Sequence, residues 1–211
     1  MSSKVKPQPL PRGRHKLPPH VVRASQRERL LAAMLDSVAE HGYEATTVPD
    51  VVAAARVSRN AFYELFDDKL DCFLALCDEA AGEMLDTLFA QRRTAGDWVA
   101  ALHAGMALYL RWWSERPAFS RAYFVALPTA GPRAIEQRDR QYARFREMFE
   151  ALGAWARAEQ PDLAPLDTLV PRLLVVATTE LVAEEVRAGR VDRLPELEDE
   201  LVGVMVRLLA I

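Results

Sequence analysis

The sequence lacks the long apolar runs that mark membrane proteins. No stretch of its 211 residues approaches the ~20 apolar residues that a membrane-spanning helix needs. The first twenty residues hold basic side chains and prolines without the apolar segment of a secretory signal. We therefore expect a cytoplasmic protein with no membrane partner.

Motifs of catalysis and metal binding are also missing. The four histidines are scattered and do not combine with the cysteines in a metal-ligand spacing; they are His15, His20, His41 and His103. There is no glycine-rich phosphate loop and no nucleophile elbow. The sequence therefore predicts neither an enzyme, nor a metal site, nor a bound cofactor.

Cysteine is scarce, with only Cys72 and Cys77 in the chain. Both fall in a predicted helix, where a separation of five residues points them to different sides and sets their Cα atoms ~7.5 Å apart by rise alone. This exceeds the ~7 Å reach of a disulfide. We expect two small buried residues, with a redox sensor as the alternative.

The chain also lacks an overall positive charge, since its net charge is −3. This argues against a protein that coats nucleic acid without selectivity. The charge is uneven, however, because the first thirty residues hold eight basic side chains against Glu28 alone. Attraction to phosphate is therefore expected at the N-terminal end. Residues 1–22 form a proline-rich basic arm, which either follows the DNA backbone and minor groove or serves as a soluble tail.

Residues 47–66 are predicted to form two short helices joined by a tight turn. Thr47 and Ser58 are suitable N-cap residues for the two helices. Phe62 and Phe66 share one face of the second helix, expected over 58–66, and point into a core. The opposite face carries hydrogen-bonding side chains, as a reader of the DNA major groove requires.

A helix over 25–41 precedes this pair. Its apolar residues recur with a period of 3.6, and Ser25 with Glu28 is a plausible capping box. Gly42 is well placed to end it. Three helices of this size can enclose a small common core.

The sequence resembles the TetR family of bacterial transcriptional regulators. The resemblance lies in the order of a first helix, Gly42-Tyr43, Thr47-Val48, residues 55–58 and Phe62-Tyr63-x-x-Phe66. The resemblance covers about a quarter of the chain. It implies an all-α fold: a three-helix DNA-binding domain with a helix-turn-helix at 23–70, then a helical-bundle ligand-binding and dimerisation domain at 71–211.

The resemblance also implies which residues meet DNA. Arg59, Asn60 and Ala61 would face base edges. The other residues of the set below would lie near the phosphate backbone. The implied DNA-binding set is Thr47, Arg56, Ser58, Arg59, Asn60, Ala61, Tyr63 and Lys69. Arg56 departs from the family, which usually has glycine at this turn, so a left-handed backbone there would be strained.

The remaining sequence is predicted to form helices over 67–91, 97–115, 119–127, 132–159, 166–188 and a last stripe from Leu197. Aromatic residues on the middle helices either fill a core or line a cavity for a small, mostly apolar effector. The candidate lining residues are Trp98, Leu102, His103, Met106, Tyr109, Trp113, Tyr123, Phe124, Phe145 and Phe149.

The last two helices are apolar on more than one side, which favours burial against a second copy of the chain. The family resemblance implies the same homodimer. The candidate interface residues are Leu173, Val176, Leu181, Leu201, Met205 and Leu208.

We therefore expect a ligand-responsive transcriptional regulator, a repressor that binds double-stranded DNA at a palindromic operator. Sequence does not separate repression from activation. The alternative is a helical small-molecule-binding or catalytic protein whose N-terminal domain only packs.

Overall fold

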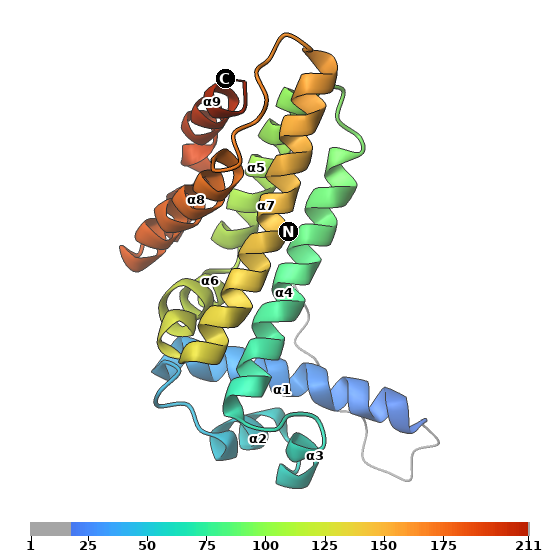
Figure 1. Ribbon diagram of the computed structural model, residues 1–211. Helices are drawn as coiled ribbons and strands as arrows, with labels where there is room; N and C mark the ends of the chain where they lie inside the picture. Colours follow the sequence, from blue (N-terminus) through green and yellow to red (C-terminus); the bar gives the residue numbers. More distant parts are fainter. Residues whose placement is uncertain (1–17, 211) are drawn as a thin grey trace.

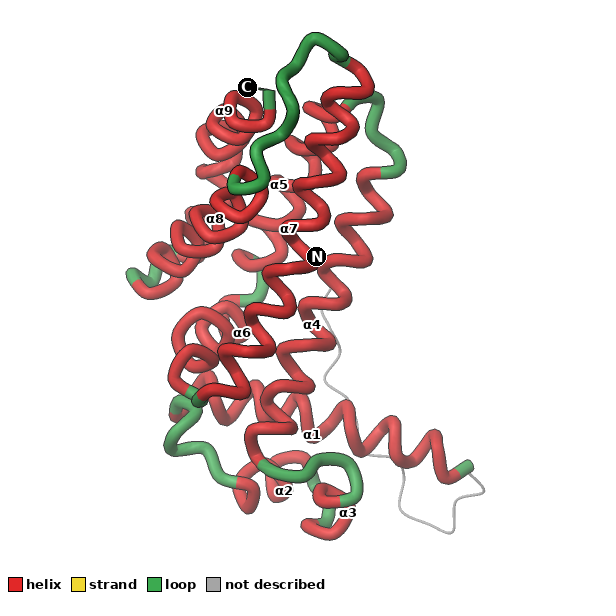
Figure 2. Tube along the Cα trace, in the orientation of Figure 1, coloured by secondary structure: helices red, strands yellow, loops and turns green. Residues whose placement is uncertain are grey.

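The computed structural model describes residues 18–210, which form helices joined by short turns, with no strand among them (Figures 1 and 2). The all-α prediction is confirmed. The elements are α1 (Pro19–His41), α2 (Val48–Ala55), α3 (Arg59–Tyr63), α4 (Lys69–Arg92), α5 (Trp98–Ser114), α6 (Pro117–Arg121), a π-helical segment (Ala122–Ala126), a 3₁₀ turn (Leu127–Thr129), α7 (Pro132–Glu159), α8 (Val170–Arg187), a 3₁₀ segment (Val191–Leu197) and α9 (Glu198–Leu209).

The first helix begins earlier than its sequence predicted. It starts at Pro19 rather than Ser25, with Pro18 as an N-cap that makes no side-chain hydrogen bond, so the predicted Ser25–Glu28 capping box does not form the start. Proline is tolerated at the first helical position because the N–H it lacks would have no partner there. Residues 1–17 of the proposed arm lie outside the described residues, and residues 19–22 belong to α1.

The two-helix stretch has the predicted caps. Thr47 accepts a hydrogen bond from the Asp50 amide, and Ser58 Oγ accepts one from the Ala61 amide at 3.1 Å. The second helix ends at Tyr63 instead of Phe66. The Phe66 amide still donates to the Phe62 carbonyl at 2.9 Å, so the backbone keeps a helical turn beyond the assigned end.

Arg56 occupies the turn between α2 and α3 in a left-handed conformation, with φ 53° and ψ 46°. It is the single residue other than glycine with positive φ among residues 18–210. The strain predicted from its sequence position is therefore present.

The long helix α4 joins the N-terminal helices to the rest of the bundle. In Figure 1, α1 crosses the start of α4, and α5 and α7 run beside its later turns. Phe73 near its start stacks on Tyr43 with ring centroids 5.1 Å apart, while Met84 and Leu88 are buried further along. One apolar core thus extends from α1 to α9.

Both cysteines lie on the buried side of α4, with free thiols. Burial raises the pKa of Cys72 to about 12 and also raises that of Cys77. A reactive sensor needs an accessible thiolate, so this setting disfavours the redox alternative.

The left-handed turn yields a stability prediction. Replacing Arg56 by glycine removes a backbone strain of about 1–2 kcal/mol but adds roughly 0.5–1 kcal/mol of unfolded-chain entropy. Arg56→Gly should therefore leave the free energy of unfolding in urea unchanged or raise it by up to about 1 kcal/mol. The matched control is Ala54→Gly, an exposed position inside α2, which should lower that free energy by about 1 kcal/mol. Equal losses in the two variants would contradict the strain.

Candidate nucleic-acid interface and apolar cavity

The outer face of α3 presents polar side chains, and the opposite face buries two phenylalanine rings. Phe62 is fully buried and Phe66 nearly so, which fixes the helix against the core. Arg59 and Asn60 are exposed, and Tyr63 is 47% exposed. The Arg59 guanidinium lies 5.6 Å from the centre of the Tyr63 ring. Within residues 18–210, neither Arg59 nor Asn60 has a side-chain hydrogen-bond partner, so both can contact an external surface.

Arginines of α1 hold the helix-turn-helix in place. Arg29 donates to the carbonyls of Ala55 at 2.7 Å and Arg56 at 3.1 Å, where α2 ends. Arg23 donates to the Glu64 carbonyl at 3.3 Å, just after α3. Cations suit these helix ends because the carbonyls there have no partner within the helix. The positive charge of these arginines predicted attraction to phosphate. In the structure they instead donate hydrogen bonds to carbonyls within the chain.

Lys69 is also used internally. Its Nζ donates to the Tyr43 carbonyl at 2.8 Å and lies 4.1 Å from the centre of the Tyr43 ring. The family resemblance implied a phosphate contact for this residue. In the structure it joins the start of α4 to the segment after α1.

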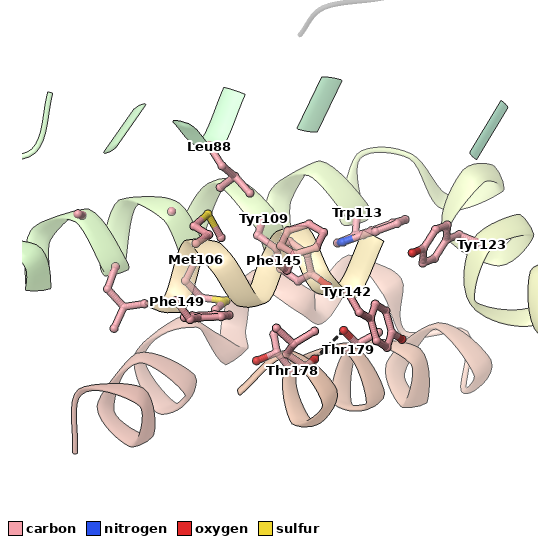
Figure 3. A pocket seen from close by; sticks show the side chains of 15 residues that line it. Leu88, Met106, Tyr109, Trp113, Tyr123, Tyr142, Phe145, Phe149, Thr178 and Thr179 are labelled. Carbon is pink, nitrogen blue, oxygen red and sulfur yellow. Dashed lines mark hydrogen bonds between the residues drawn. The ribbon is translucent and has the colours of Figure 1, made fainter. Parts of the chain in front are cut away.

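An apolar cavity lies between α4, α5, α7 and α8 (Figure 3). Its free volume is about 50 Å³, below the roughly 300–1,000 Å³ of small-molecule sites, so an occupant of that size would have to displace lining side chains. Seven of the candidate lining residues border it: Leu102, Met106, Tyr109, Trp113, Tyr123, Phe145 and Phe149.

Three candidate lining residues lie elsewhere, which corrects the prediction. Trp98 is buried in the core at the start of α5, and Phe124 packs on Trp113 with ring centroids 4.5 Å apart. His103 points to α9, with Nδ1 3.5 Å from a Glu198 carboxylate oxygen. Asp199 lies close to this pair, and both carboxylates suit the first turn of α9 without a metal ion.

Sequence reasoning missed eight residues that border the cavity. They are Leu88, Ala101, Gly105, Tyr142, Met148, Val175, Thr178 and Thr179. Tyr142 stands three residues before Phe145 on the same helical face, and this spacing was the available signal. Small residues such as Gly105 line the cavity by leaving space, which an aromatic pattern cannot indicate.

The few polar side chains that border the cavity differ in the hydrogen bonds that they make. The Tyr123 hydroxyl donates to Gln141 Oε1 at 2.7 Å, and burial raises its pKa well above the ordinary value. Thr179 Oγ1 donates to the Val175 carbonyl at 2.7 Å. Trp113 Nε1 is buried without a hydrogen bond of good geometry among residues 18–210, and its interaction with the Tyr109 hydroxyl partly offsets the rise in the pKa of Tyr109 that burial causes.

Buried glutamines connect this cavity to α4. Gln141, bound to Tyr123, donates through Nε2 to Asp78 at 3.3 Å. One turn earlier, Gln137 donates to the Leu74 carbonyl at 2.7 Å. The Tyr123–Gln141–Asp78 series, called the relay below, thus runs from the cavity wall to α4, the helix that follows α3 in the chain.

The last helices expose apolar side chains. Leu173 is 49% exposed and Val176 50%, and Leu181 is also exposed. These three fit the predicted interface. Met205 is only 2% exposed and Leu201 is buried too, so these two belong mainly to the core of the chain itself. Leu208 is half-buried at the groove between α8 and α9.

None of the helices within residues 18–210 combines the length and the apolar character that crossing a membrane requires.

Comparison with known proteins finds two kinds of similarity. Residues 30–76 match the model of "Bacterial regulatory proteins, tetR family". The HTH-type transcriptional repressor AcnR of Corynebacterium efficiens is 39% identical over 64 residues, which are 30% of this chain and 34% of that protein. AcnR of Corynebacterium glutamicum is 38% identical over the same shares. The match thus spans about a third of the length of these curated relatives.

Solved structures share the fold along most of the chain. The fatty acid degradation regulator FadR from Bacillus halodurans superposes with a TM-score of 0.79 at 18% identity, covering 91% of this chain and 97% of that one. FadR from Bacillus subtilis, solved in complex with stearoyl-CoA, has a TM-score of 0.77 at 15% identity, covering 85% and 97%. Residues 30–76 therefore match the tetR family of bacterial regulatory proteins in sequence, and the solved structures show the fold of nearly the whole chain.

Proposed function

We propose that this protein is a transcriptional repressor that binds a palindromic operator as a homodimer and is released by a small, mostly apolar effector. The observation that carries the proposal is the outer face of α3, where Arg59 and Asn60 are exposed and, within residues 18–210, have no hydrogen-bond or ion-pair partner. Repression is supported by the AcnR relatives, which are named repressors.

The DNA contacts follow from the side chains on that face. Arginine pairs with guanine and asparagine with adenine in the major groove, which suits Arg59 and Asn60 at the start of α3. Ala61 is small enough for close approach, and Tyr63 reaches sideways toward the backbone. Arg56 is exposed at the turn and adds positive charge beside them.

A homodimer is supported by the apolar surface of α8 and α9. Exposed leucine and valine side chains gather there beside a groove of about 300 Å³. A two-fold axis would let each copy cover the same surface of its partner. The same two-fold axis would place the two α3 helices at half-sites of the operator that lie about one helical turn of DNA apart.

The cavity between α4, α5, α7 and α8 is the proposed effector site. An occupant would contact Leu88 of α4 and the Tyr123 end of the relay. Because α4 packs on α1 and follows α3 in the chain, an occupant that shifts α4 would change the spacing of the two DNA-binding units. The effector needs only to favour the spacing that does not fit the operator.

The first prediction concerns sequence readout. Selection of random duplexes by the purified protein should enrich an inverted repeat, and Arg59→Ala should relax base preference at one position per half-site at a cost of ~1–3 kcal/mol. The control Arg93→Ala changes an exposed arginine at the opposite end of α4 and should leave binding unchanged. Absence of enrichment at low salt would favour the alternative in which the N-terminal domain only packs.

The second prediction concerns the cavity. The neutral dye N-phenyl-1-naphthylamine fluoresces in apolar sites and should bind the protein. Gly105 borders the cavity, so Gly105→Leu should weaken dye binding by about tenfold or more. Gly82→Leu is the matched control, because Gly82 lies on α4 with open space around it. Equal dye affinity in both variants would place the dye outside the cavity.

The third prediction concerns the relay. Tyr123→Phe leaves the Gln141 oxygen buried without a donor and should lower the free energy of unfolding by ~1–3 kcal/mol. It should also weaken the coupling between dye and operator DNA. This coupling is measured as the ratio of the dye affinity without operator DNA to the dye affinity with it. Ser120→Ala removes another buried hydrogen bond, to the Trp113 carbonyl, and should lose stability while keeping that ratio. A ratio unchanged by Tyr123→Phe would exclude the relay from coupling.

A further inference from the structure

The turn between α2 and α3 has the hydrogen bonds of a helix end that most often uses glycine. The Val57 amide donates to the Val52 carbonyl at 3.0 Å. The Arg56 amide donates to the Ala53 carbonyl at 3.2 Å. This pair of bonds is the Schellman arrangement, whose left-handed residue is usually glycine because a Cβ atom strains that conformation. Here the left-handed residue is Arg56.

One arginine of α1 binds two further carbonyls of this turn. Arg29 Nη1 donates to the Ala55 carbonyl at 2.7 Å and to the Arg56 carbonyl at 3.1 Å. Its Nε donates to the Ser25 carbonyl of α1 itself at 3.3 Å. The Arg29 side chain is half-buried and has no carboxylate partner among residues 18–210. Because the guanidinium is planar and bonded through two of its nitrogens, it is held in one orientation.

These bonds explain how a residue other than glycine is kept in the left-handed conformation. A strained backbone persists where the surrounding structure over-determines it. The two amide bonds of the turn fix its start, and Arg29 fixes the carbonyl of Arg56 on the other side of the strained residue. The α1 helix, which packs against α2 in Figure 1, thus determines the conformation of the turn.

The same turn sets the direction in which α3 leaves α2. Ser58, two residues after Arg56, caps α3 through the Ala61 amide, and Arg59 and Asn60 follow in its first turn. The helix has only five residues, so a change in φ or ψ at Arg56 reorients all of its outer face. Hydrogen bonds to base edges need side chains placed within a fraction of an ångström.

We propose that Arg29 is a positioning residue for sequence readout. It holds the left-handed turn from which α3 presents Arg59 and Asn60 to base edges, and its own bonds stay within the protein. It thereby permits an arginine at position 56, whose side chain is exposed and has no hydrogen-bond or ion-pair partner among residues 18–210. This inference rests on the proposed function and names a residue that determines its specificity.

The rival role for Arg29 is a phosphate contact, which its charge alone would predict. A phosphate contact steepens the salt dependence of DNA affinity and strengthens binding to all sequences alike. A positioning residue instead raises the specificity ratio, defined as the Kd for random-sequence DNA divided by the Kd for the operator. Measuring both quantities therefore separates the two roles.

The test measures binding of the full-length protein to random-sequence DNA and to the inverted repeat that the unaltered protein enriches, over a series of salt concentrations. Arg29→Met removes the donors and keeps an unbranched side chain. It should lower the specificity ratio by about tenfold or more, because Arg59 and Asn60 lose their alignment with the bases. The salt slope of random-sequence binding should stay unchanged.

The matched control is Ser37→Ala, also on α1. Ser37 Oγ donates to Thr46 Oγ1 at 3.1 Å, in the segment before α2 and away from the α2–α3 turn. Its loss should lower the urea midpoint of unfolding while the specificity ratio stays unchanged. A loss of specificity in this control equal to that of Arg29→Met would assign the effect to general destabilisation and overturn the positioning role.

Two further variants keep the test decisive if Arg29→Met destabilises the fold. Arg29→Lys keeps the charge but has one nitrogen in place of the planar group, so it should still lower the specificity ratio. In an Arg56→Gly background, Arg29→Met should lower the ratio by only about threefold or less, because glycine adopts the left-handed turn without support. Equal losses with arginine and glycine at position 56 would contradict the link to the strained turn.

The outcomes distinguish this inference from the proposed function. If the unaltered protein binds its operator and both Arg29 variants keep the full specificity ratio, the positioning role is wrong and the proposed function stands. A flatter salt slope for Arg29→Met, with full recovery in Arg29→Lys, would assign a phosphate contact and also overturn the inference. Absence of any enriched sequence for the unaltered protein would contradict the proposed function and this inference together.

Discussion

The arrangement depends on one helix that is packed at both ends against different neighbours. Near its start, α4 buries Phe73 against Tyr43 of the N-terminal unit, and near its end it places Leu88 at the apolar cavity. Its 24 residues span roughly 36 Å. Because α4 packs on the N-terminal unit at one end and borders the cavity at the other, it joins these two parts of the chain.

The start of α4 is held by several independent contacts. Asp68 caps the helix and accepts from Arg133 of α7 at 2.9 Å, while Lys69 donates to the Tyr43 carbonyl. These contacts join three segments that are distant in sequence. They give a structural use to a lysine that the family resemblance placed at phosphate.

Charged and polar groups therefore divide into two sets. Arg23 and Arg29 satisfy carbonyls at helix ends, where the energetic benefit comes from the fold itself. Arg59 and Asn60 on α3 have no such use inside the described chain. Arg138 Nε is buried without a hydrogen bond among residues 18–210. The unpaired side chains of α3 are those on which the proposed function rests.

Sequence by itself determined the features that depend on near neighbours along the chain. The caps Thr47 and Ser58, the bounds of α7 at 132–159 and the left-handed strain at Arg56 follow from local backbone chemistry. The sequence pattern placed the start of this helix at Ser25, where a capping box was plausible. The structure places it at Pro19, because proline is also suited to the first helical position.

Tertiary structure alone decided which side chains meet across helices. Helical periodicity shows that Trp98, Trp113 and Phe124 are buried, but it does not show whether another side chain or empty space lies opposite each one. Lys69 binds a carbonyl in the turn after α1, and Gln141 binds Asp78 on α4, 63 residues away in the sequence. A period of 3.6 residues specifies the direction of a side chain from its own helix axis, and the packing of the neighbouring helices determines what that side chain contacts.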